Sequence, residues 1–136
     1  MKKIDDVILN KVGVIERCLN RIYANYQGEL RLDDYDQQDI LILNLQRASQ
    51  AAIDIAMHVC TSRKFGVPQT SSAAFEMLAI GQLVSRSVVD QMKLMTGFRN
   101  IAVHDYQDLS LDILKNVLDR HLGDFDAFKE EVVALA

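Results

Sequence analysis

Apolar residues recur along most of this chain at intervals of three and four residues, which is the spacing of an amphipathic helix. The pattern predicts a first helix over residues 2–26 and a long second helix over residues 36–63. The second helix has one continuous apolar stripe and further apolar residues over much of its circumference, so we expect it to be central and buried. Gly66 and Pro68 interrupt the pattern and predict a loop over residues 64–70.

Three further helices are predicted in the second half of the chain, each starting at a serine that can cap its first turn. The first is a short helix from Ser72 (or Ser71, which fits less well) to about Leu83. The second opens with the capping-box-like pair Ser87 and Asp90 and ends between Val103 and Tyr106. The third runs from Leu111 to about Leu135 and is capped by Ser110. Gly28 is the predicted C-terminal cap of the first helix, and Gly123 predicts either a bend in the last helix or a separate short helix. One proline and six glycines are too few for a fold rich in tight turns. The predicted fold is all-α: an antiparallel four-helix bundle with one additional short helix, in a single domain over residues 1–136.

Composition and charge narrow the class of protein. A chain of 136 residues, 49% hydrophobic and 25% charged, is typical of a soluble globular domain with a hydrophobic core. The net charge of −4 disfavours a broad basic surface for nucleic acid, although it leaves room for a small positive site. The basic residues within 1–6 precede no apolar run, which argues against a signal peptide, and no uncharged stretch reaches the roughly 18 residues of a membrane span.

The two cysteines predict neither a disulfide framework nor a metal site. Cys18 and Cys60 lie far apart in sequence and inside helical patterns, so we expect reduced core residues in a cytoplasmic protein. The chain contains no CxxC, HExxH or histidine-rich cluster, and no metal or other cofactor is expected.

Residues 99–106 carry the main candidate chemistry. Arginine clamps a phosphate with a planar fork of donors, and histidine transfers a proton near neutral pH. Arg99, His104 and Tyr106 therefore place a phosphate ligand, an acid or base and a modifiable hydroxyl close together. A helix C-terminus with His104 capping the last carbonyls is the structural alternative. Asn100 is expected either to orient phosphate or His104, or to cap the helix end.

On an ideal helix Arg99 and His104 do not point the same way. Arg99 shares a stripe with apolar residues and Tyr106, whereas His104 lies with Asn100 roughly 140° around the helix, at 3.6 residues per turn. Either the helix unwinds near Val103, or two copies pair so that arginine and histidine from both chains line one groove. We favour the homodimer, because an arginine buried without an anion is costly and a shared cleft that admits phosphate relieves that cost.

A polar stripe also crosses the second helix and is open to two interpretations. It consists of Asn44, Arg47, Asp54 and His58. It is either the solvated face of the helix, or Asp54 and His58 point into a cleft and support the chemistry of residues 99–106, with Asp54 pairing with Arg99 or His104.

The motif Arg99-x4-His104-x-Tyr106 resembles the signature of the HepT-like HEPN proteins, and the resemblance extends over nearly the whole chain. It includes residues 51–58 in the second helix and 81–84 before the fourth. The resemblance implies a bundle homodimer that is the toxin of a bacterial type VII-like toxin–antitoxin pair and a metal-independent endoribonuclease. Carried onto this chain, the family's catalytic residues are Arg99 and His104. The implied antitoxin is a minimal (MntA-like) nucleotidyltransferase that silences the toxin by AMPylation of Tyr106.

Physical chemistry is compatible with this reading. Metal-free RNA cleavage needs a base for the 2′-hydroxyl, an acid for the leaving 5′-oxygen and positive charge at the phosphorus. An imidazole with a pKa near ~6.5 serves as either base or acid, whereas the guanidinium of Arg99 keeps its proton and stabilises charge. The alternative is a non-catalytic HEPN module that binds a nucleotide or a nucleotidyltransferase, which the acidic net charge favours.

Overall fold

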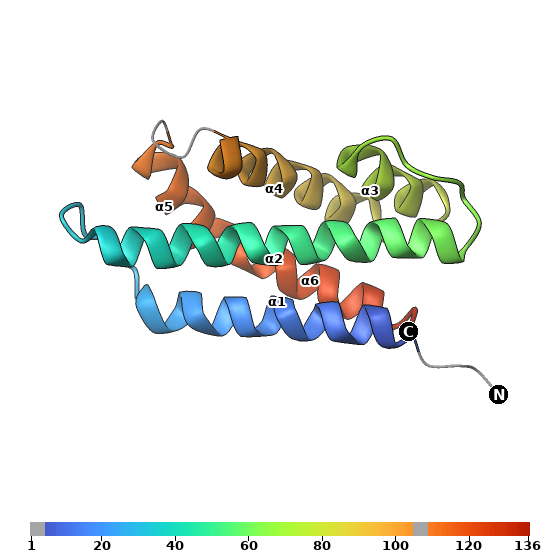
Figure 1. The fold of residues 1–136 in the computed structure, drawn as a ribbon, viewed down its shortest axis with the longest axis horizontal. Coiled ribbons are helices and arrows are strands. Elements are labelled where there is room, and N and C mark those ends of the chain that lie inside the picture. The colour runs from blue at the N-terminus through green and yellow to red at the C-terminus, as the bar shows by residue number, and fades with distance from the viewer. Residues whose placement is uncertain (1–4, 105–108) are drawn as a thin grey trace.

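The computed structural model describes residues 5–104 and 109–136, and these form six helices without a strand. The helices are α1 (Asp6–Asn25), α2 (Tyr35–Ser62), α3 (Ser71–Ile80), α4 (Arg86–His104), α5 (Leu111–Arg120) and α6 (Leu122–Val133). Figure 1 shows α1, α2, α4 and the α5–α6 pair running in alternating directions, with the short α3 beside the end of α2. The predicted all-α antiparallel bundle is confirmed.

Helix α2 is the centre of the bundle, as its apolar circumference predicted. It packs against α1, α3, α4 and α6, and Leu41, Leu45 and Ile55 on it are fully buried. Phe75 of α3 and Phe128 of α6 complete the core with an edge-to-face ring contact. Cys18 and Cys60 are buried, which confirms the prediction that both are core residues.

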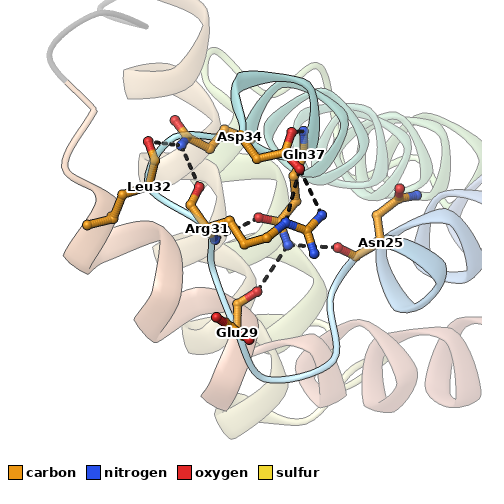
Figure 2. Close-up of polar contacts among 7 residues, drawn as sticks. Asn25, Glu29, Arg31, Leu32, Asp34 and Gln37 are labelled. Carbon is orange, nitrogen blue, oxygen red and sulfur yellow. Dashed lines mark hydrogen bonds and ion pairs between the residues drawn. The ribbon is translucent and has the colours of Figure 1, made fainter.

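Two buried glutamines hold the connection between α1 and α2. Figure 2 shows the Gln37 amide donating to the carbonyl oxygens of Asn25 and Glu29 while its own oxygen accepts from the Arg31 N–H. The Gln38 amide donates to two further carbonyls of the same loop, those of Arg31 and Leu32. These bonds pair backbone groups of the loop with two buried side chains, so α1 and α2 are fixed side by side in one register.

The helix ends differ from the predicted ones at three positions. Helix α1 ends at Asn25 with Tyr26 as its C-cap, and Gly28 lies two residues beyond this cap in the left-handed region. Thr70 rather than Ser72 caps α3, because its side chain accepts from the Ala73 N–H. Ser87 lies inside α4, since the helix is already under way at Arg86.

Side-chain contacts determine where α4 starts and accompany the division of the last predicted helix into α5 and α6. Ser85 donates its N–H and its hydroxyl to Glu131 of α6, which fixes the entry into α4. The last predicted helix is interrupted at His121 rather than at Gly123. A ring nitrogen of His121 lies 2.8 Å from the Asp124 carboxylate in the first turn of α6. This contact stabilises the first turn of α6, where the backbone hydrogen bonds of a continuous helix are missing.

None of the helices in the described part of the chain is long and apolar enough to cross a membrane.

Candidate active site

Arg99 lies near the end of α4 with its side chain against α2. The stripe to which it belongs is otherwise apolar: Val88, Met92, Met95 and Ala102 are buried, as predicted. Arg99 itself is half-buried, because its long side chain reaches out between the two helices. The fold thus places a permanent positive charge at the junction of α2 and α4.

Two amide oxygens hold the Arg99 guanidinium. One terminal nitrogen, Nη2, donates to Gln50 Oε1 at 2.5 Å, and the other, Nη1, donates to Asn100 Oδ1 at 3.0 Å. The Nε is buried and has no hydrogen-bond partner within residues 5–104 and 109–136. No carboxylate of the described chain forms an ion pair with Arg99, so its charge is not neutralised there.

Asp54 does not pair with Arg99 directly. Its Oδ2 forms an ion pair with Lys11 of α1 at 3.0 Å, and its Oδ1 accepts from the Gln50 amide at 2.9 Å. The interpretation in which Asp54 contacts Arg99 directly is therefore wrong, because the spacing of α2 brings Gln50 between the two charges, while a pairing of Asp54 with His104 stays a prediction. Asp54 is linked to Arg99 through Gln50.

The rest of the polar stripe on α2 divides among different surroundings. Asn44 is buried and donates to the Ile40 carbonyl one turn earlier, whereas Arg47 is exposed. His58 contacts Asp5 at the start of α1, with Nε2 to carboxylate oxygen distances of 2.7 and 3.0 Å. The stripe is thus neither a uniform solvated face nor one cleft, and His58 belongs to the α1–α2 contact.

The electrostatics of Asp5 fit a structural role for this contact. Partial burial raises the pKa of the Asp5 carboxyl. Hydrogen bonds from His58 and from the N–H groups of Ile8 and Val7 lower this pKa by more than burial raises it, so the pKa lies below its usual value. Asp5 is also the N-cap of α1, where a negative charge is favourable. The carboxylate therefore stays ionised and joins the two helices.

Asn100 orients Arg99 in this structure, through the bond to its guanidinium. Helix α4 is described as far as His104, and the side chain of His104 lies outside what the structure describes. Tyr106 lies outside the described residues as well. The roles predicted for His104 and Tyr106 therefore stay predictions.

Gln50 and Lys11 are the residues of this site that the sequence did not reveal. An uncharged amide in a long helix carries no signal of its own, and the pairing of Lys11 with Asp54 depends on the register between α1 and α2. A signal for Gln50 does exist in the spacing to Asp54, since residues four apart share one face of a helix.

An apolar groove lies between α4 and α5, next to this site. It has a volume of about 370 Å³. Leu94, Ile101 and Ile113 on its rim are 69%, 40% and 46% exposed, so three large apolar side chains line the groove in contact with water. No group of three or more His, Cys, Asp and Glu side chains that could hold a metal ion occurs in the part of the chain that the structure describes.

The fold and the Arg99 contacts define a small helical-bundle protein in which two amide oxygens hold an arginine near the end of α4. The model of the family described as ribonuclease HepT-like matches residues 8–132. This chain therefore belongs to the ribonuclease HepT-like family.

Similar proteins have been named and solved. The mRNA nuclease HepT of Shewanella oneidensis is 44% identical over 131 residues, which cover 96% of this chain and 98% of that protein. The tRNA nuclease HepT of Aphanizomenon flos-aquae is 32% identical over 112 residues, with 80% and 76% covered. A solved structure of the tri-AMPylated Shewanella oneidensis HEPN toxin in complex with MNT antitoxin matches with a TM-score of 0.90 and 44% identity, over 96% of this chain and 98% of that one.

Proposed function

We propose that this chain is the ribonuclease toxin of a toxin–antitoxin pair and that it cleaves RNA without a metal ion at a site built on Arg99 and His104. The observation that carries the proposal is the state of Arg99. Its guanidinium is anchored by two neutral amide oxygens and pairs with no carboxylate of the described chain. A cation kept in this way is suited to a phosphate, and relatives that cover nearly the whole chain are named nucleases.

In the proposed reaction the 2′-hydroxyl of the substrate attacks the adjacent phosphorus. The O2′–P bond forms as the P–O5′ bond breaks, and the products are a 2′,3′-cyclic phosphate and a 5′-hydroxyl. A base removes the 2′-hydroxyl proton, and an acid gives a proton to the leaving 5′-oxygen. His104 supplies these proton transfers, while Arg99 stabilises the charge that grows on the phosphorane oxygens.

The proposed active form is a homodimer. The exposed apolar groove between α4 and α5 supports it, because a second copy would remove Leu94 and Ile101 from water. A twofold pairing of α4 would bring an arginine and a histidine from each chain to one cleft. The two histidines would then divide the roles of acid and base.

The proposed regulator is a minimal nucleotidyltransferase that transfers AMP to Tyr106. Support comes from the tri-AMPylated toxin that is similar to this chain over 96% of its length. An attached AMP would add a negative phosphodiester within reach of Arg99 and would fill the cleft with a nucleotide. RNA would then be excluded both by charge and by volume. We place this pair of proteins in the cytoplasm and treat residues 1–136 as one domain.

Cleavage of RNA by purified protein in EDTA tests the proposal. Wild-type protein should cut RNA, and Arg99→Ala and His104→Ala should each abolish cleavage while the far-UV circular dichroism stays unchanged. Arg99→Lys should restore little activity, because an ammonium lacks the bidentate fork of donors. Arg120→Ala and His58→Ala, which change the same residue types elsewhere, should cut RNA normally. Full activity of His104→Ala would refute the acid–base assignment, and inactive wild-type protein would favour a non-catalytic binding module.

A further inference from the structure

Four side chains form an unbroken line across α2, from α4 on one side to α1 on the other. Arg99 of α4 donates to Gln50 Oε1 at 2.5 Å, and Gln50 Nε2 donates to Asp54 Oδ1 at 2.9 Å. Lys11 of α1 donates to the other Asp54 oxygen at 3.0 Å. Three helices are therefore tied together by one chain of hydrogen bonds that ends on the proposed phosphate ligand.

The carboxylate of Asp54 determines which way the Gln50 amide faces. A carboxylate in an ion pair with Lys11 accepts hydrogen bonds and has no proton to donate. Gln50 must therefore turn its NH₂ group toward Asp54, and its carbonyl oxygen is left facing Arg99. The reverse orientation would bring amide N–H groups against the guanidinium and would leave Asp54 facing an acceptor.

The same arrangement keeps the charge of Arg99 from being cancelled. The negative charge of Asp54 is opposed by Lys11, and among the described residues the guanidinium donates only to the neutral amides of Gln50 and Asn100. A carboxylate at position 50 would instead pair with Arg99 and compete with any phosphate for its donors. The network thus supplies orientation without supplying a counter-charge.

The burial of the Arg99 Nε makes the contact of the guanidinium with the Gln50 amide important. The Arg99 Nε is buried and without a hydrogen bond among the described residues, so the guanidinium depends on its two terminal nitrogens for a fixed position. Asn100 holds one of them from a neighbouring position on α4, while Gln50 supplies the contact to another helix. Loss of Gln50 would free the guanidinium to rotate away from the α2–α4 junction.

We propose that Gln50 is a positioning residue that aims Arg99 at the RNA phosphate, and that Asp54 and Lys11 fix the orientation of its amide. This inference rests on the proposed function, because Arg99 is assigned there as the group that stabilises the phosphorane. It adds a role for Gln50, and it replaces the direct contact between Asp54 and Arg99 with an indirect one.

Substitutions at position 50 test the proposal through kinetics in EDTA. Gln50→Met keeps the size of the side chain but removes both hydrogen bonds, and kcat should fall about 10- to 100-fold, as expected for a lost bond to a charged group. KM should change much less, since a loosely held arginine still attracts RNA. Gln50→Glu should lower kcat by about 100-fold or more, because the new carboxylate neutralises Arg99. Asp54→Asn, which allows the amide to turn over, should give a smaller loss.

A matched control separates positioning from net charge and stability. Gln27→Glu adds the same negative charge at an exposed site in the loop just after α1 and should keep wild-type kcat. Wild-type kcat for both Gln50→Met and Gln50→Glu, even with a lowered Tm, would overturn the proposal and leave Gln50 with a purely structural role.

A second readout does not depend on activity. The Arg99 Nε–H group can be followed by NMR and assigned through its absence in Arg99→Lys. In wild-type protein its exchange with water should be slow because the atom is buried, and Gln50→Met should accelerate the exchange at least 10-fold. Unchanged exchange in Gln50→Met would overturn the positioning role. Inactive wild-type protein with accelerated exchange in Gln50→Met would instead reject the proposed function and retain the contact.

Discussion

Arg99 shows how a single residue acquires a chemical role from its neighbours. Its stripe on α4 is apolar, and Met92 and Met95 are almost fully buried there. A cation in such surroundings would normally be matched by a carboxylate. In the described part of the chain two amide oxygens serve instead, and no carboxylate there pairs with Arg99.

His58 is the residue whose assignment changes most between sequence and structure, and its substitution separates the two interpretations. We expect His58→Ala to lower the free energy of unfolding by about 1 kcal/mol, because the half-buried contact with Asp5 is lost. RNA cleavage should stay at the wild-type rate, since His58 contacts α1 rather than Arg99. Urea denaturation and a cleavage assay measure the two effects. A large loss of cleavage with normal stability would place His58 back in the reaction.

Tyr106 gives the second prediction at this scale. Tyr106→Phe keeps the ring and removes the oxygen that would accept AMP, so the variant should fold and cut RNA normally. It should escape silencing when it is co-expressed with the cognate nucleotidyltransferase and supplied with ATP. Mass spectrometry of wild-type protein from the same co-expression should locate AMP on Tyr106. AMP on another residue, or no AMP at all, would reject this mechanism of control.

Charged residues within apolar patterns could be predicted from the sequence, whereas their partners could not. Arg99 and Asp54 stand out because a charge interrupts a buried stripe or a helix face. Gln50 has no charge and stands out only after the structure shows what lies on each side of it. Asn44 was grouped with a polar stripe that faces either solvent or a cleft, but it is buried, since a short amide can form its hydrogen bond within its own helix.

At the scale of helices, the bounds of α2 were predicted to within about one residue, while the caps of other helices were not. Several serines and threonines compete to start α3, and the choice depends on which one the preceding loop leaves extended, which here is Thr70. The start of α4 is set by Glu131, a residue 46 positions away from Ser85. Local sequence contains no information on such a contact.

The junction of α3 and α4 provides a prediction on pH. Hydrogen bonds from Arg86 and then Lys93 lower the pKa of the Glu76 carboxyl from 4.5 to about 2. A lowered pKa means that this contribution to stability is present above pH 4.5 and is lost as the pH falls toward 2. Glu76→Gln should therefore have a lower Tm than wild-type protein at pH 7.

The Tm difference between the two proteins should shrink as the pH is lowered through this window, and thermal melts at several pH values measure it. Glu130→Gln, which removes an exposed carboxylate of α6, is the control and should show no such dependence. A difference that persists unchanged at the lowest pH would mean that Glu76 stabilises the junction by shape rather than by charge.

At the scale of the whole molecule, the all-α bundle followed from helical periodicity and from the scarcity of glycine and proline. Periodicity could not predict how neighbouring helices are positioned relative to one another, because this depends on side-chain packing between distant segments. The groove between α4 and α5 is one result of this placement, and it leaves three large apolar side chains exposed.

We predict that this groove is covered by a second copy of the chain. The protein should sediment at micromolar concentration with twice the 15.4 kDa mass of one chain. Leu94→Glu should sediment as a monomer with normal circular dichroism, because a charge in an apolar interface is unfavourable. Leu32→Glu changes a leucine of similar exposure in the α1–α2 loop and should leave the dimer intact. A wild-type protein that sediments only as a 15.4 kDa monomer would contradict the proposed active form.

The central claim is that Arg99 and its surroundings support metal-free cleavage of RNA by its own 2′-hydroxyl. The most direct measurement is mass spectrometry of the products formed from a defined RNA by purified protein in EDTA. We expect fragments that end in a 2′,3′-cyclic phosphate and fragments that begin with a 5′-hydroxyl. Intact RNA, or fragments that end in a 3′-hydroxyl, would contradict it.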